Sequence, residues 1–417
     1  MTATIPLFWE QFQVGAIVAD EQGVRLVYDH RWQNSMGRGA FPVSLTMPLT
    51  LKEHEALSWL TNLLPEAPAT MRAMERRLGV AAEDVVGLLS RIGRDTAGAL
   101  SIGTPRGTTW KDEHLRRIPD DTALERIISE LPAKPFLVGE EGVSMSLAGV
   151  QEKLPVALID GQLAIPLDDS PSTHIIKPAP TDRLPGAAHN EALCLLLANR
   201  CGLQAAEATT GRAGERTYLL VTRYDRLYTR DHWRRLHQED FCQALGRSPS
   251  AKYEKGGGFK GVTLVDMFGL VDKNMTAADK LRLLDAVVYN VIICNTDSHA
   301  KNYSALFVGS TIFLAPLYDL MCADCWEVTR KLPQTIDGKE GGDYLYGRHW
   351  KRMAKACGFN PTAAVRRVEA LADKVIAALP GAVADVETMP AGSHPLLRDF
   401  EAAIAKRCSA IKRQLGE

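Results

Sequence analysis

The sequence predicts an α+β protein with three parts: a small N-terminal α/β subdomain, a mainly β lobe and a mostly helical C-terminal lobe. Short β-prone runs joined by tight-turn signals gather between residues 113 and 225. From residue 226 to residue 417, apolar side chains recur mainly at helical spacing. We therefore expect the parts to span residues 1–112, 113–225 and 226–417. The N-terminal part should contain strands at Gly15–Asp20 and Val24–Tyr28 and a helix at Glu53–Leu64.

The β lobe is predicted to contain a hairpin. Leu154–Ile159 and Gln162–Ile165 flank Asp160–Gly161, a strong two-residue turn signal. The segment Ser144–Lys153 precedes this hairpin and is a candidate loop over nucleotide phosphates. It carries a single glycine, Gly149, in place of the pattern G-x-G-x-x-G, so by itself it is a weak nucleotide signature.

A lysine and a glutamate follow in the order that kinases use. Thr173–Lys177 is predicted to be a strand that ends in a lysine, where kinases place the lysine that contacts the α- and β-phosphates. Glu191 opens a segment whose apolar residues share one helical face, with Gly202 at the expected C-terminal cap. We expect Glu191 to pair with Lys177. The alternatives are a solvated lysine at a strand end and a first-turn glutamate favoured by the helix dipole.

The segment Cys294–Asn302 carries the most informative pattern of the chain. Asp297 and Asn302 have the D-x-x-x-x-N spacing of the protein-kinase catalytic loop, in which the Asp accepts the proton of the acceptor hydroxyl and the Asn binds Mg²⁺. An amphipathic pattern before it predicts a helix that ends at Asn295. The alternative is that Asp297 and Asn302 only shape a turn.

A second carboxylate is expected to complete this site. Tyr303–Val308 and Ile312–Leu317 are predicted to form a hairpin, which would return Asp319 to the side of Asn302. Two hard oxygen ligands suit Mg²⁺, which usually takes one or two protein groups together with phosphates and waters.

Together these segments resemble the HipA-type serine/threonine kinases, which are toxins of bacterial type II toxin–antitoxin modules. The shared motifs stand in family order along nearly the whole chain. They are Asn62–Pro65, Ile92–Asp95, Gly98–Ala99, Ser146–Lys153, Thr173–Lys177, Gln238–Asp240, Asp297–Asn302 and Tyr318–Asp319. The resemblance implies a protein-kinase-like two-lobed fold with an extra N-terminal subdomain, and ATP and Mg²⁺ as cofactors.

The resemblance also implies a role for each matching residue. Asp297 would be the catalytic base, Asn302 and Asp319 would bind Mg²⁺, Lys177 would contact the ATP phosphates, and Gly149 and Lys153 would belong to the phosphate loop.

In this family, a serine just before the loop autophosphorylates and inactivates the enzyme by expelling the loop from the site. Ser146 takes that place here, followed by Leu147 where the family has valine, and Ser144 offers a second hydroxyl. A phosphoserine carries roughly −1.5 to −2 charges and would repel the phosphates of ATP. The alternative is that both serines are ordinary loop hydroxyls.

Two further pairs of residues are expected to contact nucleotide or substrate. The family places its adenine hinge at Thr222 and Tyr224, so their backbone groups would meet the adenine edge and Tyr224 would form an aromatic wall. Tyr224 as a half-buried strand-end tyrosine is the alternative. His299 and Lys301 would orient substrate or neutralise developing phosphate charge, although a histidine beside a turn is more often a hydrogen-bonded structural residue.

Composition agrees with a globular cytoplasmic enzyme. The chain has 417 residues, of which 46% are hydrophobic and 24% charged, enough for large cores. Its net charge of −1 does not indicate a nucleic-acid binder, so any DNA contact would be local or made through a partner. The densest basic run, Arg223–Arg235, is expected to be a solvated, acid-paired surface segment.

Other local signals favour no additional site. The eight cysteines are scattered, and the C-x-x-C at Cys322–Cys325 is interpreted as incidental, mostly buried thiols. The glycine-rich segment Lys255–Gly261 is predicted to be a flexible loop and lacks the lysine-serine end of a P-loop. No apolar run reaches membrane-spanning length, so we expect no membrane contact.

Three classes of function remain. The leading one is a protein kinase that transfers the γ-phosphoryl group of ATP to a seryl hydroxyl; the resemblance implies an aminoacyl-tRNA synthetase as target, with arrest of translation and growth. A small-molecule phosphotransferase would use the same residues. A non-catalytic corepressor would act by binding a helix-turn-helix antitoxin and, through it, DNA. The joint presence of Lys177, Asp297, Asn302 and Asp319 argues against a purely structural role.

Overall fold

The computed structural model describes residues 3–35, 39–181, 183–256 and 260–416. The glycine-rich segment predicted as a flexible loop includes residues 257–259, which lie outside the described residues.

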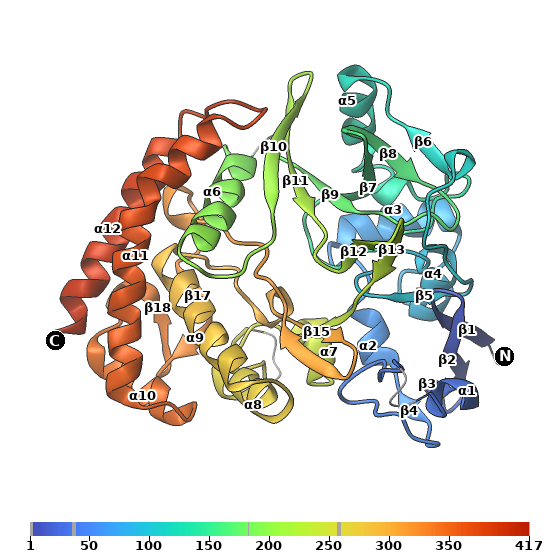
Figure 1. Cartoon of the computed structure of the whole chain (residues 1–417), viewed down its shortest axis with the longest axis horizontal. Coiled ribbons are helices and arrows are strands. Elements are labelled where there is room, and N and C mark those ends of the chain that lie inside the picture. Colours follow the sequence, from blue (N-terminus) through green and yellow to red (C-terminus); the bar gives the residue numbers. More distant parts are fainter. Residues whose placement is uncertain (1–2, 36–38, 182, 257–259, 417) are drawn as a thin grey trace.

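An antiparallel sheet and four helices form the N-terminal end of the molecule (Figure 1). The sheet has the order β4-β3-β2-β1-β5, with β1 Ala3–Trp9, β2 Phe12–Asp20, β3 Gly23–Tyr28, β4 His54–Glu55 and β5 Leu100–Ile102. The helices are α1 His30–Gln33, α2 Leu57–Thr61, α3 Pro68–Leu78 and α4 Val85–Ile92. The helix predicted at Glu53–Leu64 is therefore wrong at both ends. His54 and Glu55 instead pair with β3, whose edge would otherwise leave backbone groups unpaired.

A second, antiparallel sheet forms the middle of the molecule. Its order is β10-β11-β9-β7-β8-β6, with β6 Leu115–Arg117, β7 Leu154–Ile159, β8 Gln162–Pro166, β9 His174–Pro178, β10 Ala208–Ala213 and β11 Arg216–Thr222. The predicted β7–β8 hairpin is confirmed, and its turn residues Asp160 and Gly161 have φ of 51° and 79°, as a tight hairpin turn requires. The helices α5 Asp121–Glu130 and α6 Ala187–Arg200 accompany this sheet.

Helix α6 begins earlier than predicted. Gly186, with φ of 74°, stands at its N-terminal cap, so Glu191 lies in the second turn and not the first. A helix-dipole effect on a first-turn glutamate therefore does not explain this residue.

The remainder of the chain is mostly helical, as predicted. Its larger helices are α8 Leu264–Asn274, α9 Ala277–Ile292, α10 Gly347–Ala356, α11 Pro361–Glu387 and α12 Leu397–Leu415. Shorter elements are α7 Phe241–Ala244 and the strands β12 Arg226–Thr229, β13 His232–Arg235, β14 His237–Asp240, β15 Ser304–Val308, β16 Thr311–Leu314, β17 Lys331–Ile336 and β18 Lys339–Gly341. Single 3₁₀ turns occur at Asp112–His114, Pro135–Leu137, Pro249–Ala251, Ala300–Asn302, Ala323–Cys325 and Gly342–Tyr344.

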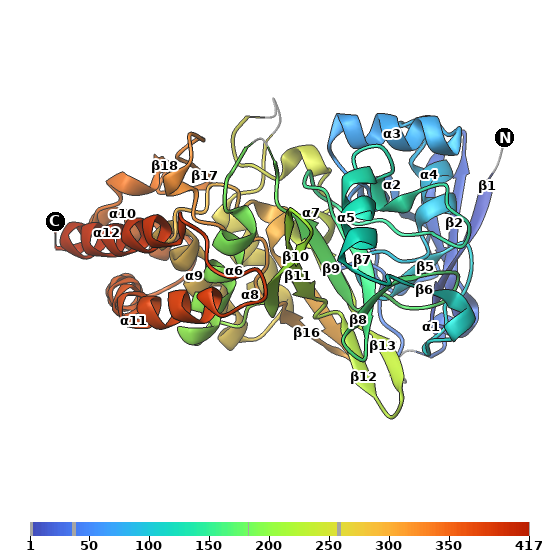
Figure 2. The same cartoon turned by 90° about the horizontal axis from the view of Figure 1, so that it is seen from above.

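The central sheet lies between the two ends of the molecule, with α11 and α12 farthest from the N-terminal sheet (Figures 1 and 2). The N-terminal part nevertheless reaches inward, because Pro65 bridges to Gly149 and Asp95 bridges to Met145. Both of these bridges join the N-terminal part to the segment predicted to cover phosphates.

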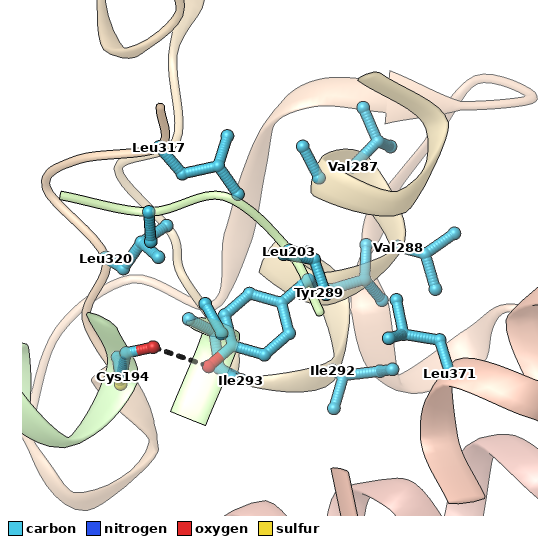
Figure 3. Packing of buried hydrophobic residues seen from close by; sticks show 14 of the residues in the cluster. Cys194, Leu203, Val287, Val288, Tyr289, Ile292, Ile293, Leu317, Leu320 and Leu371 are labelled. Atoms are coloured by element: carbon cyan, nitrogen blue, oxygen red, sulfur yellow. Dashed lines mark hydrogen bonds between the residues drawn. The ribbon is translucent and has the colours of Figure 1, made fainter. Parts of the chain in front are cut away.

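Helix α9 anchors the C-terminal lobe. Tyr289 is fully buried in it, and its hydroxyl donates a hydrogen bond of 2.6 Å to the Cys194 carbonyl of α6, as Figure 3 shows. The apolar face predicted for this helix is confirmed by the burial of Leu284, Val288 and Ile292. This packing fixes the helix end that leads into Asn295 and the catalytic segment.

The basic run after β11 is only in part the solvated, acid-paired surface segment that was predicted: Arg230 and Arg234 are exposed, whereas Arg223, Arg226 and Arg235 are buried. Arg223 and Arg226 are buried, and each donates to a buried carboxylate: Arg223 to Asp225 at 2.8 Å and Arg226 to Asp95 at 2.8 Å. Asp95 lies between α4 and β5, so its partner is more than one hundred residues away in sequence. The three cations Arg106, Arg226 and Arg223 hold the pKa of Asp95 well below its ordinary value, although burial alone would raise it.

All eight cysteines are free thiols, with Cys322 buried and Cys325 half-buried. Within the described ranges, no helix is both long and apolar enough to cross a bilayer.

Candidate active site

A single cleft between the lobes contains most of the residues that the sequence singled out. It has an empty volume of about 960 Å³, part of it open to solvent, which is the size range of small-molecule sites. The predicted site residues that line it are Gly149, Lys153, Lys177, Thr222, Tyr224, His299, Lys301, Asn302 and Asp319.

Lys177 lies where the two lobes meet. Its ammonium donates to Glu191 Oε1 at 2.7 Å and also forms a close ion pair with the Asp319 carboxylate. Burial would lower the pKa of Lys177, but Asp319 and Glu191 together raise it above its ordinary value, so the side chain stays charged. Burial also raises the pKa of Glu191 against the effect of Lys177. The lysine therefore joins β9, α6 and the segment after β16.

The candidate phosphate loop is shaped around Gly149. This glycine has φ of 107°, and a Cβ there would stand 2.6 Å from the Lys153 ammonium. Lys153 donates to the Ala148 carbonyl at 2.6 Å, and burial lowers its pKa to about 8. The Glu66 amide donates to the Gly149 carbonyl at 3.1 Å, so the N-terminal part holds the loop from outside.

The two candidate modification sites are both buried. The Ser146 hydroxyl donates to the Leu63 carbonyl at 2.8 Å, and Ser146 is fully buried. The Ser144 hydroxyl donates to the Arg91 carbonyl at 2.8 Å. In this arrangement, both hydroxyls are hydrogen bonded to the N-terminal part and face away from solvent.

Asp297 does not line the cleft itself; its carbonyl contacts two residues that do, His299 and Asn302, and 55% of its side chain is exposed. Its carboxylate accepts a close hydrogen bond from the Tyr253 hydroxyl. Desolvation raises the pKa of Asp297 against the effect of this hydrogen bond. Asn302 is tied to the same residue, because its amide Nδ2 donates to the Asp297 carbonyl at 2.7 Å.

The donor atoms at Asn302 and Asp319 fit a magnesium ion. Since Nδ2 of Asn302 is used by the Asp297 carbonyl, its Oδ1 remains as an uncharged oxygen ligand. Asp319 has φ of 52°, and Asn295 donates from Nδ2 to its carbonyl at 3.0 Å, which fixes an otherwise unfavourable backbone. Lys177 and then Lys153 lower the pKa of Asp319 to about 2 against the opposing effect of burial, so it is a carboxylate at neutral pH.

No group of three or more acidic, histidine or cysteine side chains that could hold a metal was found in the part of the chain that the structure describes. A site of one carboxylate and one amide therefore suits Mg²⁺ with substrate phosphates better than a structural metal.

Lys301 has structural partners that the sequence did not reveal. It donates to Asn62 Oδ1 at 2.7 Å and to Asp240 Oδ2 at 2.7 Å. Burial lowers the pKa of His299 to about 3, so this ring is neutral at physiological pH, and its buried Nδ1 has no hydrogen-bond partner among the described residues. Positive charge in the cleft therefore comes from lysines and from Arg223.

The hinge residues Thr222 and Tyr224 line the cleft, but some of their hydrogen-bonding groups already have partners within the protein. The Thr222 amide donates to the Glu207 carbonyl at 2.8 Å, which leaves that N–H unavailable for an adenine edge. The Tyr224 ring stacks on Tyr318 with centroids 5.9 Å apart, and its hydroxyl donates to Gln238. Tyr224 is half-buried, so its ring offers a wall and its backbone remains the better adenine contact.

Several residues at the site were not assigned from the sequence. Tyr253 contacts Asp297, Asn62 and Asp240 hold Lys301, and Glu66 pairs with Lys252 at 2.6 Å. Their contacts span from 44 to 239 residues in sequence, so no local pattern marks them; the family motifs at Asn62–Pro65 and Gln238–Asp240 hinted at a role for Asn62 and Asp240 alone.

Comparison with known proteins identifies the family. The model of the HipA-like C-terminal domain matches residues 145–380, and the model of the HipA N-terminal domain matches residues 6–103. The chain belongs to the HipA family. This HipA-family chain is 31% identical to the serine/threonine-protein kinase toxin HipA of Shewanella oneidensis, over 85% of this chain and 84% of the relative.

Two further similarities cover almost the whole HipA-family chain. The protein Y4mE of Sinorhizobium fredii, whose name classes it with kinases, is 32% identical over 97% of this chain and 98% of its own. The solved structure of Shewanella oneidensis HipA with HipB and operator DNA has a TM-score of 0.82 and 26% identity, covering 99% of this chain and 98% of that one. The α+β fold predicted from the sequence is thereby confirmed.

Proposed function

We propose that this chain is an ATP- and Mg²⁺-dependent serine/threonine protein kinase that acts as the growth-arresting toxin of a toxin–antitoxin module. One observation carries the proposal: Lys177 links Glu191 of α6 to Asp319, inside a cleft that Asn302 also lines. Positioning and charge stabilisation account for most of the catalysis of phosphoryl transfer, and this cleft offers both.

Each residue then has one task. Lys177 and Lys153 would bind the phosphates of ATP, and Asn302 and Asp319 would hold Mg²⁺, whose charge would offset the negative charge of the phosphates. Since Lys177 retains Glu191 as a partner, Asp319 can exchange the ammonium for a metal ion. The Tyr224 ring and the adjoining hinge backbone contact the adenine.

In the transfer step, the acceptor hydroxyl oxygen forms a bond to the γ-phosphorus. The bond from that phosphorus to the bridging oxygen of the β-phosphate breaks, and ADP leaves. The hydroxyl proton passes to Asp297. Desolvation of this carboxylate, which raises its pKa, makes it a better proton acceptor than a fully solvated aspartate.

Ser146 is the proposed site of autophosphorylation. Its hydroxyl is buried against the Leu63 carbonyl, so phosphorylation requires the loop to leave its place, and the phosphate charge then opposes its return. Ser144 has an equivalent bond to Arg91 and serves as the comparison residue.

The acceptor and the partner are proposed by similarity. The name of one relative, a serine/threonine-protein kinase toxin, supports a protein acceptor over a small-molecule acceptor. From the resemblance of the sequence motifs, we propose a cytoplasmic acceptor such as an aminoacyl-tRNA synthetase. The solved complex of a relative with HipB and operator DNA supports a helix-turn-helix antitoxin as partner, with DNA contacted mainly through it. The same complex favours corepression as a second function.

The test is incubation with labelled ATP and Mg²⁺, alone and with cell lysate. Label on Ser146 and on one discrete protein is expected, whereas label only in small metabolites would contradict a protein acceptor. Asp297→Ala should lower transfer roughly 100-fold or more, the usual contribution of a catalytic base. The matched control is Asp272→Ala, because that carboxylate is 62% exposed and pairs only with Lys280 among its described ion pairs.

A further inference from the structure

Tyr253 makes a contact that the mechanism above leaves unexplained. Its hydroxyl donates to Oδ1 of Asp297, the carboxylate proposed to accept the proton of the acceptor hydroxyl. A serine about to react would have to make this same hydrogen bond. The phenol therefore stands where the acceptor hydroxyl must arrive.

The position of Tyr253 is built into the fold. The carbonyl of the preceding residue, Lys252, accepts from the Ala300 amide at 3.1 Å and from Gln334 at 2.8 Å. The amide of the following residue, Glu254, donates to the Pro333 carbonyl at 2.9 Å, and its carboxylate accepts from the Thr335 amide at 2.6 Å. Backbone on both sides of the tyrosine is thus fixed to the catalytic segment and to β17.

The ring is also held in place. It packs edge-on against His299, with centroids 5.1 Å apart and an interplanar angle of 87°. The Lys252 ammonium lies 5.4 Å from the ring centroid and pairs with Glu66. Tyr253 is 36% exposed, so one side of the ring faces solvent and an approaching acceptor.

Tyr253 contacts Asp297 but lies outside the lining of the cleft proposed to bind the nucleotide. The described residues that line the cleft include His299 and Asn302 but not Tyr253. A change at residue 253 should therefore alter access to Asp297 and leave ATP affinity intact.

We propose that Tyr253 is the acceptor-side gate of the site: its phenol occupies Oδ1 of Asp297, the place that a protein hydroxyl takes, and so competes with water for that oxygen until a protein hydroxyl displaces it. Water is a competing acceptor in any kinase, since its oxygen can attack the γ-phosphorus, release ADP and pass a proton to the same base. Tyr253 is thus a specificity-determining residue that favours a protein hydroxyl over water. This inference rests on the proposed kinase function.

The experiment compares Tyr253→Phe and Tyr253→Ala by ADP release from MgATP without a protein acceptor. All proteins carry Ser146→Ala, so that autophosphorylation does not consume ATP. Tyr253→Phe keeps the ring but loses the hydroxyl, so it should raise ADP release up to roughly tenfold, the equilibrium factor expected when one net hydrogen bond is lost. Tyr253→Ala also loses the ring and should give a larger increase. Tyr344→Ala is the matched control, because that tyrosine is 68% exposed.

Binding of a fluorescent ATP analogue and the melting temperature are measured for every variant. Unchanged nucleotide affinity with raised ADP release supports the gate. ADP release that is unchanged or lower in Tyr253→Ala, with turnover intact in the parent, overturns the gate alone. A parent protein without Asp297-dependent turnover overturns the proposed function, and the gate with it.

Discussion

Lys301 illustrates how the structure changes the role expected of a catalytic-loop residue. The side chain is 3% exposed and donates to the carbonyl of Asn62 at 3.1 Å, to its Oδ1 at 2.7 Å and to Asp240 Oδ2 at 2.7 Å. Burial raises the pKa of Asp240, and Lys301 opposes that shift. We therefore expect Lys301→Met to leave a buried carboxylate without its ion partner.

The expected cost follows from that loss. Removing one member of a buried ion pair costs about 3–5 kcal/mol, more than the net contribution of the pair itself. We expect Lys301→Met to lower the free energy of unfolding by about 3 kcal/mol or more. In the double variant Lys301→Met/Asp240→Asn, the loss should be smaller than the sum of the single losses by roughly 1–3 kcal/mol, because the two residues share one interaction.

A second lysine, the half-buried Lys153, provides the control. Lys153 donates to one carbonyl, that of Ala148, and its ammonium faces the candidate phosphate loop. Lys153→Met should cost roughly 1 kcal/mol of stability but abolish transfer. Urea denaturation followed by fluorescence measures the first quantity, and labelled ATP the second. If Lys301→Met unfolds at the same urea concentration as the parent and loses only transfer, the structural role argued here is refuted.

Two other predictions concern the loop and a buried carboxyl. Gly149→Ala should raise the KM for ATP roughly tenfold with little change in melting temperature, because a residue at φ of 107° is strained by about 1–2 kcal/mol and its Cβ would displace Lys153. Glu239 accepts from the Leu45 amide at 2.8 Å, and burial raises its pKa from 4.5 to about 8. Because the pKa of Glu239 is raised in the folded state, its contribution to stability is complete below pH 4.5 and is lost as the pH rises through about 8. Between pH 4.5 and 7, this group alone lowers the free energy of unfolding by roughly 3 kcal/mol. The melting temperature of Glu239→Gln should vary less with pH between 4.5 and 7 than that of the parent protein. If both proteins show the same dependence of melting temperature on pH, the assignment of this effect to Glu239 is contradicted.

Helices and strands were predictable from the sequence where neighbouring residues alone determine them. The β7–β8 hairpin follows from two turn residues with positive φ, and the apolar face of α9 from periodicity alone. The start of α6 was not predictable in this way, because it depends on the left-handed Gly186, and the short strand β4 depends on an available edge of β3. Both errors lie at element ends, where tertiary context decides between competing local states.

The partners of the site residues were hidden for a different reason. Motif spacing indicated Lys177, Asp297, Asn302 and Asp319. The fold brings Lys177, Asn302 and Asp319 into one cleft, and Asp297 adjoins it through its contact with Asn302. The spacing of motif residues along the sequence does not show which side chains contact them in the folded protein. The burial of Arg226 against Asp95 shows the consequence, since Arg223 and Arg226 were predicted to lie on the surface but belong to an interior ion-pair network.

The N-terminal part is therefore a component of the active site and not an appended domain. Its segment at residues 62–66 contacts both the candidate phosphate loop and the candidate catalytic loop. Leu63 accepts from the Ser146 hydroxyl, the Glu66 amide donates to the Gly149 carbonyl, and Asn62 accepts from Lys301. The phosphate loop and the catalytic loop are thus held to a common support. Phosphorylation of Ser146 would remove the hydroxyl proton that Leu63 binds and place a divalent charge in a fully buried position. The Glu66 amide binds the carbonyl of Gly149, three residues after Ser146 in the same loop. Loss of the Ser146 hydrogen bond would therefore weaken this second bond as well, so that one modification would disrupt the whole phosphate site.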